Sequence, residues 1–240
     1  MTKPHAAGVR WSWWRRHGAP RFGGPLWLCV LGGMLLAAVS MGWGSGSRFD
    51  IDPDILARME ERYGKDARQR LKAWQRLMLR NGGSEYKKLA QVNAFFNRLD
   101  FVSDDRHWGK KDYWATPLEF LASNGGDCED FAVAKYFTLK QMGVPEERMS
   151  LTYVKALRLN QAHMVVTYHP KPGAEPLVLD NLEDSIKMAS KRSDLLPVYS
   201  FNGDGLWLAK QRGRGKRVGK SSRLSRWRDL LRRMRNDGLM

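Results

Sequence analysis

The spacing of apolar residues changes once along this chain, near Pro145, and the change limits which folds are possible. Before it, apolar side chains recur at helical spacing, with Leu71 and Trp74 on one face of a segment and Leu89 and Val92 on one face of the next. After it, apolar and polar residues alternate, and we predict strands over residues 149–157, 162–169 and 176–180. Helices followed by strands predict an α+β domain, and about 160 residues suffice for one core.

Local signals also place two helix boundaries near the middle of the chain. Residues 116–119, Thr-Pro-Leu-Glu, combine an N-cap, a proline at the first helical position and an acid at the third, so a short helix should begin there. The loop 123–126 then leads to a second helix, predicted from about Cys128 to Met142 and ended by Gly143. Cys128 should therefore lie in the first turn of a helix.

Residues 1–47 have the pattern of a targeting segment. They carry five Lys/Arg and no acid, an apolar run follows from Leu26 to Val39, and residues 38–40, Ala-Val-Ser, form a small-x-small cleavage site. We expect either a cleaved signal peptide or an uncleaved membrane anchor, and both place the rest of the chain outside the cytoplasm. The arginine-rich lead and the Gly/Ser-rich exit disfavour the alternative, a buried core helix.

The net charge of +16 is concentrated at the two ends of the chain. Residues 209–240 carry twelve Lys/Arg against two acids, whereas residues 48–208 hold 24 basic and 23 acidic side chains. We therefore predict a nearly neutral domain over 48–208 and a basic C-terminal tail over 209–240. A basic chain often binds nucleic acid, but an excess confined to the ends of an exported protein argues against that partner.

Within the predicted tail, an apolar stripe faces a row of arginines. Leu224, Trp227, Leu231 and Met234 recur at helical spacing. Such a helix would lie on an anionic membrane surface or dock on an acidic partner. A solvated, frayed tail is an equal alternative.

Cys128 is the single cysteine outside the N-terminal segment, because Cys29 lies in the apolar run. An unpartnered cysteine in an exported protein is either a reactive thiol or an intermolecular disulfide site. A helix N-terminus stabilises a thiolate. The neighbouring Asp127, Glu129 and Asp130 would raise the pKa of the thiol, so a base or a cation must offset their negative charge.

A base and a carboxylate follow on the predicted strands. His163 shares one strand face with Val165, whereas His169 lies at the turn before a proline, so His163 is the better candidate base. Asp180 closes the next apolar strand, where an imidazole on the neighbouring strand would supply its partner. For each residue a structural role is the alternative: an inert buried cysteine, a core histidine and a turn-forming aspartate.

Four sequence runs resemble the bacterial transglutaminase-like cysteine proteinases, and among them the LapG-type periplasmic adhesin proteases. The runs are Asp112-Tyr113-Trp114-Ala115-Thr116-Pro117-Leu118-Glu119-Phe120-Leu121, Gly126-Asp127-Cys128-Glu129-Asp130-Phe131-Ala132, Ala162-His163-Met164-Val165 and Leu179-Asp180-Asn181. The resemblance covers roughly residues 50–205. It implies a papain-like fold, in which N-terminal helices and a nucleophile-bearing helix pack on an antiparallel sheet.

The resemblance also implies a function and a set of site residues. The family member would be a calcium-dependent periplasmic endopeptidase that cuts near the N-terminus of a large surface adhesin and so promotes biofilm dispersal. An inner-membrane receptor that senses cyclic di-GMP would control it. Carried onto this chain, Cys128 is the nucleophile, His163 the base and Asp180 the orienting carboxylate. The candidate Ca²⁺ ligands are Asp127, Glu129 and Asp130.

Other interpretations of these residues stay open at this point. The three acids around Cys128 would also serve as an N-cap and first-turn acids of a helix. The same triad would serve a transglutaminase or an amidase, which passes the acyl group to another acceptor. A non-catalytic, calcium-tuned protein that binds a receptor is the third alternative.

Overall fold

The computed structural model describes residues 49–80, 82–210 and 213–240. The predicted targeting segment 1–47, with Cys29 and the candidate cleavage site, lies outside the described residues. Across the ranges that are described, no helix is both long and apolar enough to span a membrane.

Helices dominate the first part of the domain, as the sequence predicted. They are α1 (Pro53–Tyr63), α2 (Lys65–Leu79), α3 (Glu85–Phe96), α4 (Asp104–Trp108), α5 (Pro117–Ser123), α6 (Cys128–Gln141) and, near the C-terminus, α7 (Ser225–Asn236), with short 3-10 turns at η1 (Glu146–Arg148), η2 (Ala189–Lys191) and η3 (Ser221–Arg223). Thr116 and Glu119 form the capping box at the start of α5, and Ser84 caps α3. Cys128 is the first residue of α6, where the local signals placed it.

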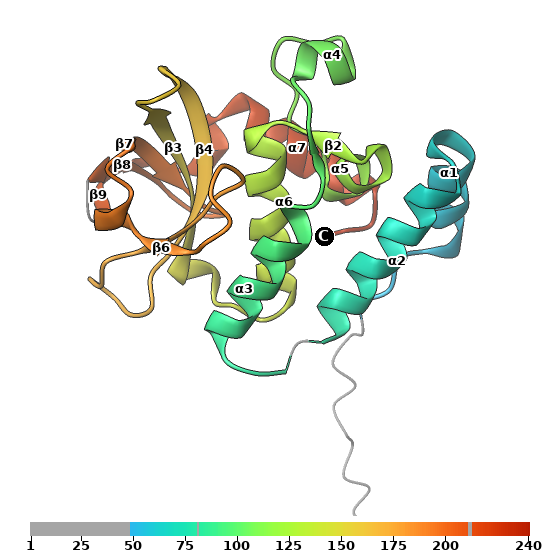
Figure 1. The fold of residues 1–240 in the computed structure, drawn as a ribbon, viewed down its shortest axis with the longest axis horizontal. Helices are drawn as coiled ribbons and strands as arrows, with labels where there is room; N and C mark the ends of the chain where they lie inside the picture. Colours follow the sequence, from blue (N-terminus) through green and yellow to red (C-terminus); the bar gives the residue numbers. More distant parts are fainter. Residues whose placement is uncertain (1–48, 81, 211–212) are drawn as a thin grey trace, which may run out of the picture. The chain divides into compact units, whose positions relative to one another are not determined.

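Strands follow α6 and form one antiparallel sheet (Figure 1). They are β3 (Met149–Ala156), β4 (Gln161–Tyr168), β5 (Leu177–Leu179), β6 (Lys187–Met188), β7 (Leu195–Phe201), β8 (Leu206–Lys210) and β9 (Gly213–Gly219). Their order across the sheet is β6-β5-β4-β3-β7-β8-β9. A separate parallel pair joins β1 (Asp100–Phe101) to β2 (Gly125–Gly126), just before α6. The predicted α+β class and the helix-on-antiparallel-sheet architecture are confirmed.

Helix α6 is the centre of this arrangement. All its residues from Asp130 to Leu139 are buried, because β3 and β4 cover one side and α3 and α5 cover the other (Figure 1). A helix buried on all sides has little freedom to shift its ends. The position of Cys128, at the N-terminus of this helix, is therefore set by the core of the domain.

The C-terminal residues belong to the domain, and the expectation of a tail outside it is wrong. Strands β8 and β9 extend the sheet, and the apolar face of α7 lies in the main core. Trp227 is 1% exposed and stacks on Phe137 of α6, with ring centroids 5.5 Å apart. Leu230 and Met234 are also buried. This face is covered by the protein itself, so it is not free to lie on a lipid surface.

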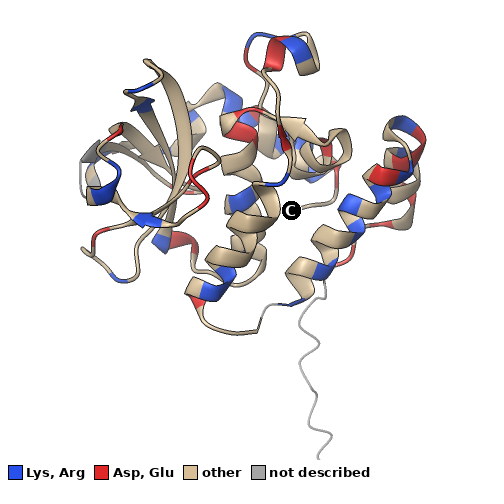
Figure 2. Ribbon diagram, viewed as in Figure 1, with Lys and Arg blue, Asp and Glu red and all other residues tan. Residues whose placement is uncertain are grey.

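Charged residues of both signs are interspersed over the described chain. Figure 2 shows Lys and Arg on α2, α3 and α4 and around the sheet, with Asp and Glu among them. Acidic residues meet at the N-terminal end of α6 and on α4. This acidic region lies beside Cys128.

Candidate active site

The loop before Cys128 is held by Asp130, which lies one turn into α6. Its Oδ1 accepts the backbone N–H of Ala115 at 2.7 Å, and its Oδ2 accepts that of Asp127 at 3.2 Å. A Cβ on Gly126 would come within 2.1 Å of Oδ2, so only glycine leaves room for this carboxyl group. Because both oxygens of Asp130 bind backbone donors, its main role here is to shape the loop.

The Cys128 thiol lies between an acid and the strand that carries His163. Its Sγ donates to Oε2 of Glu129 at 3.1 Å and accepts the backbone N–H of Met164 on β4. Burial, together with the charges of Glu129 and Asp127, raises the pKa of the thiol well above its ordinary value. The Met164 hydrogen bond works in the opposite direction, but it is a smaller effect. With these acids charged, the thiol stays protonated.

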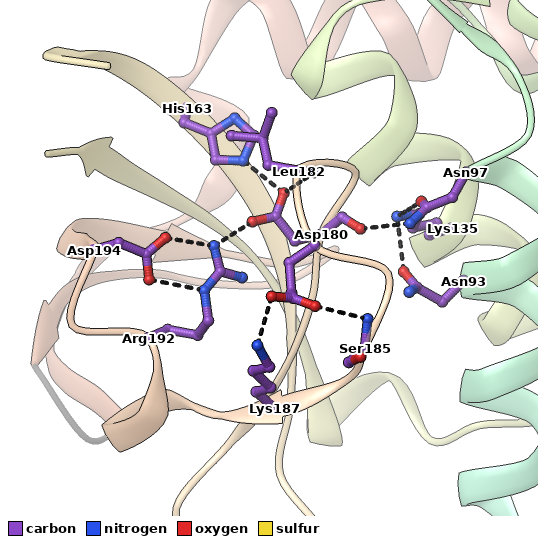
Figure 3. Close-up of polar contacts among 11 residues, drawn as sticks. Asn93, Asn97, Lys135, His163, Asp180, Leu182, Ser185, Lys187, Arg192 and Asp194 are labelled. Atoms are coloured by element: carbon purple, nitrogen blue, oxygen red, sulfur yellow. Dashed lines mark hydrogen bonds and ion pairs between the residues drawn. The ribbon is translucent and has the colours of Figure 1, made fainter. Parts of the chain in front are cut away.

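His163, on β4, and Asp180, at the end of the neighbouring strand β5, form a buried pair. His163 is 2% exposed on β4, and Asp180, directly after β5, is 1% exposed. Nε2 of His163 lies 2.7 Å from Oδ1 of Asp180, which leaves Nδ1 as the ring nitrogen available for proton transfer (Figure 3). His169 lies in the turn after β4 instead, with Nδ1 3.1 Å from the carbonyl oxygen of Ala174.

Further donors fix Asp180. Its Oδ1 also accepts the N–H of Leu182 at 3.1 Å, and its Oδ2 accepts Nη2 of Arg192 at 2.7 Å (Figure 3). Burial alone would raise the pKa of Asp180, but the hydrogen bonds from His163, Leu182 and Arg192 lower it to about 2. The carboxylate is therefore charged at neutral pH and keeps the proton of His163 on Nε2.

Arg192 is itself held in place by a second acid. Its guanidinium donates to both oxygens of Asp194, at 3.0 and 2.9 Å (Figure 3). The Arg192 side chain is 5% exposed. Fork-shaped pairing of this kind fixes orientation as well as charge. Sequence reasoning did not identify Arg192, because a single arginine after a turn carries no local signal of a buried partner.

On the other side of Cys128 several acids gather, and Oδ2 of Asp104 accepts the backbone N–H of Tyr113. Carboxylate oxygens of Asp104, Asp112 and Glu129 lie within 4.8 Å of one another, and so do those of Asp104, Asp127 and Asp130. Among the described residues, Oδ1 of Asp104 and Oδ1 of Asp127 are buried and have no hydrogen-bond partner. Burial and neighbouring acids raise the pKa of Asp104 to about 6 and that of Asp127 to about 8.

This donor set fits a hard cation. Calcium takes six to eight oxygen ligands in flexible geometry, and buried carboxylate oxygens without donors are the atoms it would bind. Asp127, Glu129 and Asp130 were predicted as ligands, and all three lie among these acids. Asp104 and Asp112 were not predicted, because they lie 24 and 16 positions before Cys128 and only the fold brings them together. Asp112 begins one of the four runs that carry the family resemblance.

Helix α7 contacts the outer edge of this cluster. Nε of Arg226 lies 2.7 Å from Oδ2 of Asp112, and both side chains are about half-exposed. Arg233 donates to the backbone carbonyl of Trp114 and to Oε2 of Glu119, the latter at 2.6 Å. The C-terminal helix therefore braces the loop that carries Asp112.

Comparison with known proteins decides the family. The family model described as the bacterial transglutaminase-like cysteine proteinase matches residues 59–202. The chain belongs to this family. No curated protein matches it.

Solved structures of LapG from Legionella pneumophila are similar to this member of the family. One is 44% identical to this chain and has a TM-score of 0.66, and the match covers 75% of this chain and 96% of the LapG chain. An EGTA-treated form is 45% identical with a TM-score of 0.67, and a calcium-bound form is 44% identical with a TM-score of 0.65. The match covers 75% of this chain in both cases, with 96% of the EGTA-treated LapG chain and 98% of the calcium-bound LapG chain. Membership in this family and likeness to LapG support a cysteine protease.

Proposed function

We propose that this protein is a calcium-dependent, periplasmic cysteine endopeptidase in which Cys128, His163 and Asp180 act as a catalytic triad. The observation that carries the proposal is the buried hydrogen bond between His163 and Asp180. His163 lies on β4, and the backbone N–H of the next residue on that strand, Met164, binds the Cys128 sulfur. A thiol, an imidazole and a carboxylate in this order support acyl transfer.

The geometry supports the following reaction. Nδ1 of His163 takes the thiol proton, and the Cys128 sulfur attacks the scissile carbonyl carbon. The backbone N–H of Cys128, at the start of α6, stabilises the oxyanion. His163 then gives the proton to the leaving amine, which leaves an acyl thioester. Water activated by His163 hydrolyses the thioester, and the proton returns to the thiol.

The acidic cluster has a separate part in this proposal. Asp104, Asp112, Asp127 and Glu129 would hold Ca²⁺, whose charge would offset the acids that now keep the Cys128 thiol protonated. Asp130 would keep Asp127 and the loop in place. The likeness to a calcium-bound LapG supports calcium over other cations.

The substrate and its control are proposed from the likeness to LapG. We propose cleavage of the N-terminal region of a large surface adhesin, release of that adhesin and biofilm dispersal. An inner-membrane receptor that senses cyclic di-GMP would sequester the protease. Export through residues 1–47, by a cleaved signal or an anchor, would bring all three proteins to one compartment.

Cleavage of an N-terminal fragment of the large adhesin from the same organism tests the proposal. Cys128→Ala and His163→Ala should abolish cleavage, and His169→Ala, at the other downstream histidine, should cleave like the parent. EGTA should inactivate the parent reversibly, and Mg²⁺ should restore little activity because it requires tighter octahedral geometry.

Two results would overturn the proposal. Parental cleavage by Cys128→Ala would exclude the thiol as nucleophile. Incorporation of an amine into the fragment without its hydrolysis would assign the same triad to acyl transfer instead. Full cleavage in EGTA would leave a protease but remove its calcium dependence.

A further inference from the structure

Lys135 is a buried cation in the helix that carries Cys128. It lies seven residues after Cys128 on α6 and is 1% exposed. In the described part of the chain, no carboxylate pairs with it in a salt bridge. Its Nζ donates instead to Oδ1 of Asn93 at 2.8 Å and to Oδ1 of Asn97 at 2.6 Å, both at the C-terminal end of α3 (Figure 3).

A lysine in this position is costly, so its presence needs a reason. Burying an ammonium group between two helices disfavours its charged form, and burial lowers the pKa of Lys135 to about 7. Leucine or methionine would fill the same space without that cost. The reason for Lys135 should therefore lie in what its donors fix.

Lys135 determines which way two asparagines face. An ammonium group has only donors, so it must meet the oxygen of each amide, and each NH2 group must then point away. The NH2 of Asn97 donates to the backbone carbonyl of Asp180 at 2.9 Å and to Oδ1 of Asp184 at 2.8 Å. The NH2 of Asn93 donates to the backbone carbonyl of Asp184 at 2.9 Å.

The two asparagines thereby hold both ends of the loop 180–184. The first residue of that loop is Asp180, whose side chain binds His163. A continuous set of contacts thus joins α6, which carries the nucleophile, through α3 to the carboxylate that orients the base (Figure 3).

We propose that Lys135 is a positioning residue for Asp180, acting through Asn97 and Asn93, a role that rests on the proposed triad. Without the ammonium group, either amide is free to turn its oxygen toward the carbonyl groups of the loop, where it would repel them. Asp180 would then lose its fixed position beside His163. Small displacements of an orienting group reduce turnover more than they reduce substrate binding.

Lys135→Met tests the proposal, because it keeps the volume and removes the donors. We expect kcat for the adhesin fragment to fall about tenfold or more, with KM little changed. Lys140→Met is the matched control, since Lys140 lies on the same helix and pairs with Glu146 at the surface, at 2.7 Å. It should retain parental kcat.

The dependence on Asp180 separates positioning from a general loss of stability. In an Asp180→Asn background, Lys135→Met should lower kcat by less than twofold. An equal fall of kcat in both backgrounds, or no fall in the parent, would overturn the proposal. If Lys135→Met does not fold, Asn97→Ala replaces it. Asn97 is partly exposed, and its substitution removes the hydrogen bond to the Asp180 carbonyl.

A readout without substrate keeps this test independent of the proposed function. In histidine-labelled protein, NMR should show the Nε2 proton of His163 strongly downfield and slow to exchange, because it is bonded to Asp180. Lys135→Met should shift it upfield and speed its exchange, whereas Lys140→Met should not. An unchanged signal in Lys135→Met would overturn the positioning role, whether or not the parent cleaves the adhesin.

Discussion

Carboxylates lie on both sides of the Cys128–His163 region, and the two sides differ in how the negative charge is balanced. Asp180 is buried, accepts hydrogen bonds from three residues and has a pKa lowered to about 2. Asp104 and Asp127 have buried oxygens without donors, and their pKa values are raised to about 6 and about 8. The charged form of aspartate is thus stabilised by hydrogen bonds on one side and destabilised by burial and neighbouring acids on the other.

The difference indicates which part of the site the chain completes by itself. Around Asp180 the fold supplies an imidazole, a guanidinium and a backbone N–H, so the orientation of His163 is preorganised. Around Asp127 the fold supplies mainly further acids, and in our proposal a cation completes this side of the site. The Asp180 side should therefore be insensitive to calcium, and the Asp127 side should depend on it.

The largest effect should come from breaking the satisfied side. Asp180→Asn should lower kcat by roughly 10³-fold or more, because an amide can present its N–H to Nε2 of His163 and stabilise the wrong tautomer. Asp204→Asn, at an exposed acid paired with Arg217, should leave kcat unchanged. Steady-state cleavage with saturating calcium measures both, and an Asp180→Asn rate within twofold of the parent would show that the His163–Asp180 pair is only structural.

The two sides should also respond to pH with opposite signs. Asp180 has a lowered pKa, so the stability it contributes is present above its unfolded pKa near 4 and is lost as pH falls toward about 2. The shift corresponds to about 2 kcal/mol in the free energy of unfolding. Urea unfolding between pH 5 and pH 2 should show this loss in the parent and a smaller one in Asp180→Asn.

For Asp104 and Asp127 the pKa is raised, so stability is greatest below pH 4 and is lost as pH rises through about 6 and then about 8. In EGTA the parent should therefore become less stable between pH 5 and pH 8.5, and saturating calcium should remove that decline. Urea unfolding at these pH values measures it. A decline that is identical with and without calcium would place its origin elsewhere in the chain.

A small effect should come from the arginine at the edge of the acidic cluster. Arg226 competes with a cation for Asp112, so Arg226→Gln should raise calcium affinity by about twofold to fivefold, the range expected for an exposed ion pair. Arg228→Gln removes the same charge from an exposed position of α7 and should change affinity less. Equal affinities in the two variants would show that only the net charge of α7 matters.

Much of this architecture could be predicted from the sequence, because its signals are local. Boundary residues predicted the start of α5 and the ends of α6, and apolar spacing predicted α2, α3 and the strands β3 to β5. The strands β6 to β9 were missed, since the place of a strand in a sheet depends on pairing between residues that are distant along the chain. The amphipathic pattern of α7 was identified, but a pattern does not say what covers an apolar face, and here Trp227 packs on Phe137.

The residues of the candidate site also divide into those that the sequence predicted and those that it did not. Cys128, His163 and Asp180 were found because their order along the chain and their sequence runs are specific. Arg192, Lys135 and Asp104 were not found, because their roles depend on contacts such as Arg192–Asp180, 12 residues apart, and Lys135–Asn93, 42 residues apart, that no local spacing encodes.

Calorimetric titration of calcium into the parent, Asp104→Asn and Asp105→Asn tests most directly whether the acidic side is completed by a cation. Asp104 lies in the cluster and Asp105, next to it, is exposed, so the two variants lose the same charge at adjacent positions. We predict that the parent and Asp105→Asn bind one calcium ion with equal affinity and that Asp104→Asn binds it about tenfold or more weakly. Absence of binding heat in the parent, or equal binding by all three proteins, would contradict the account.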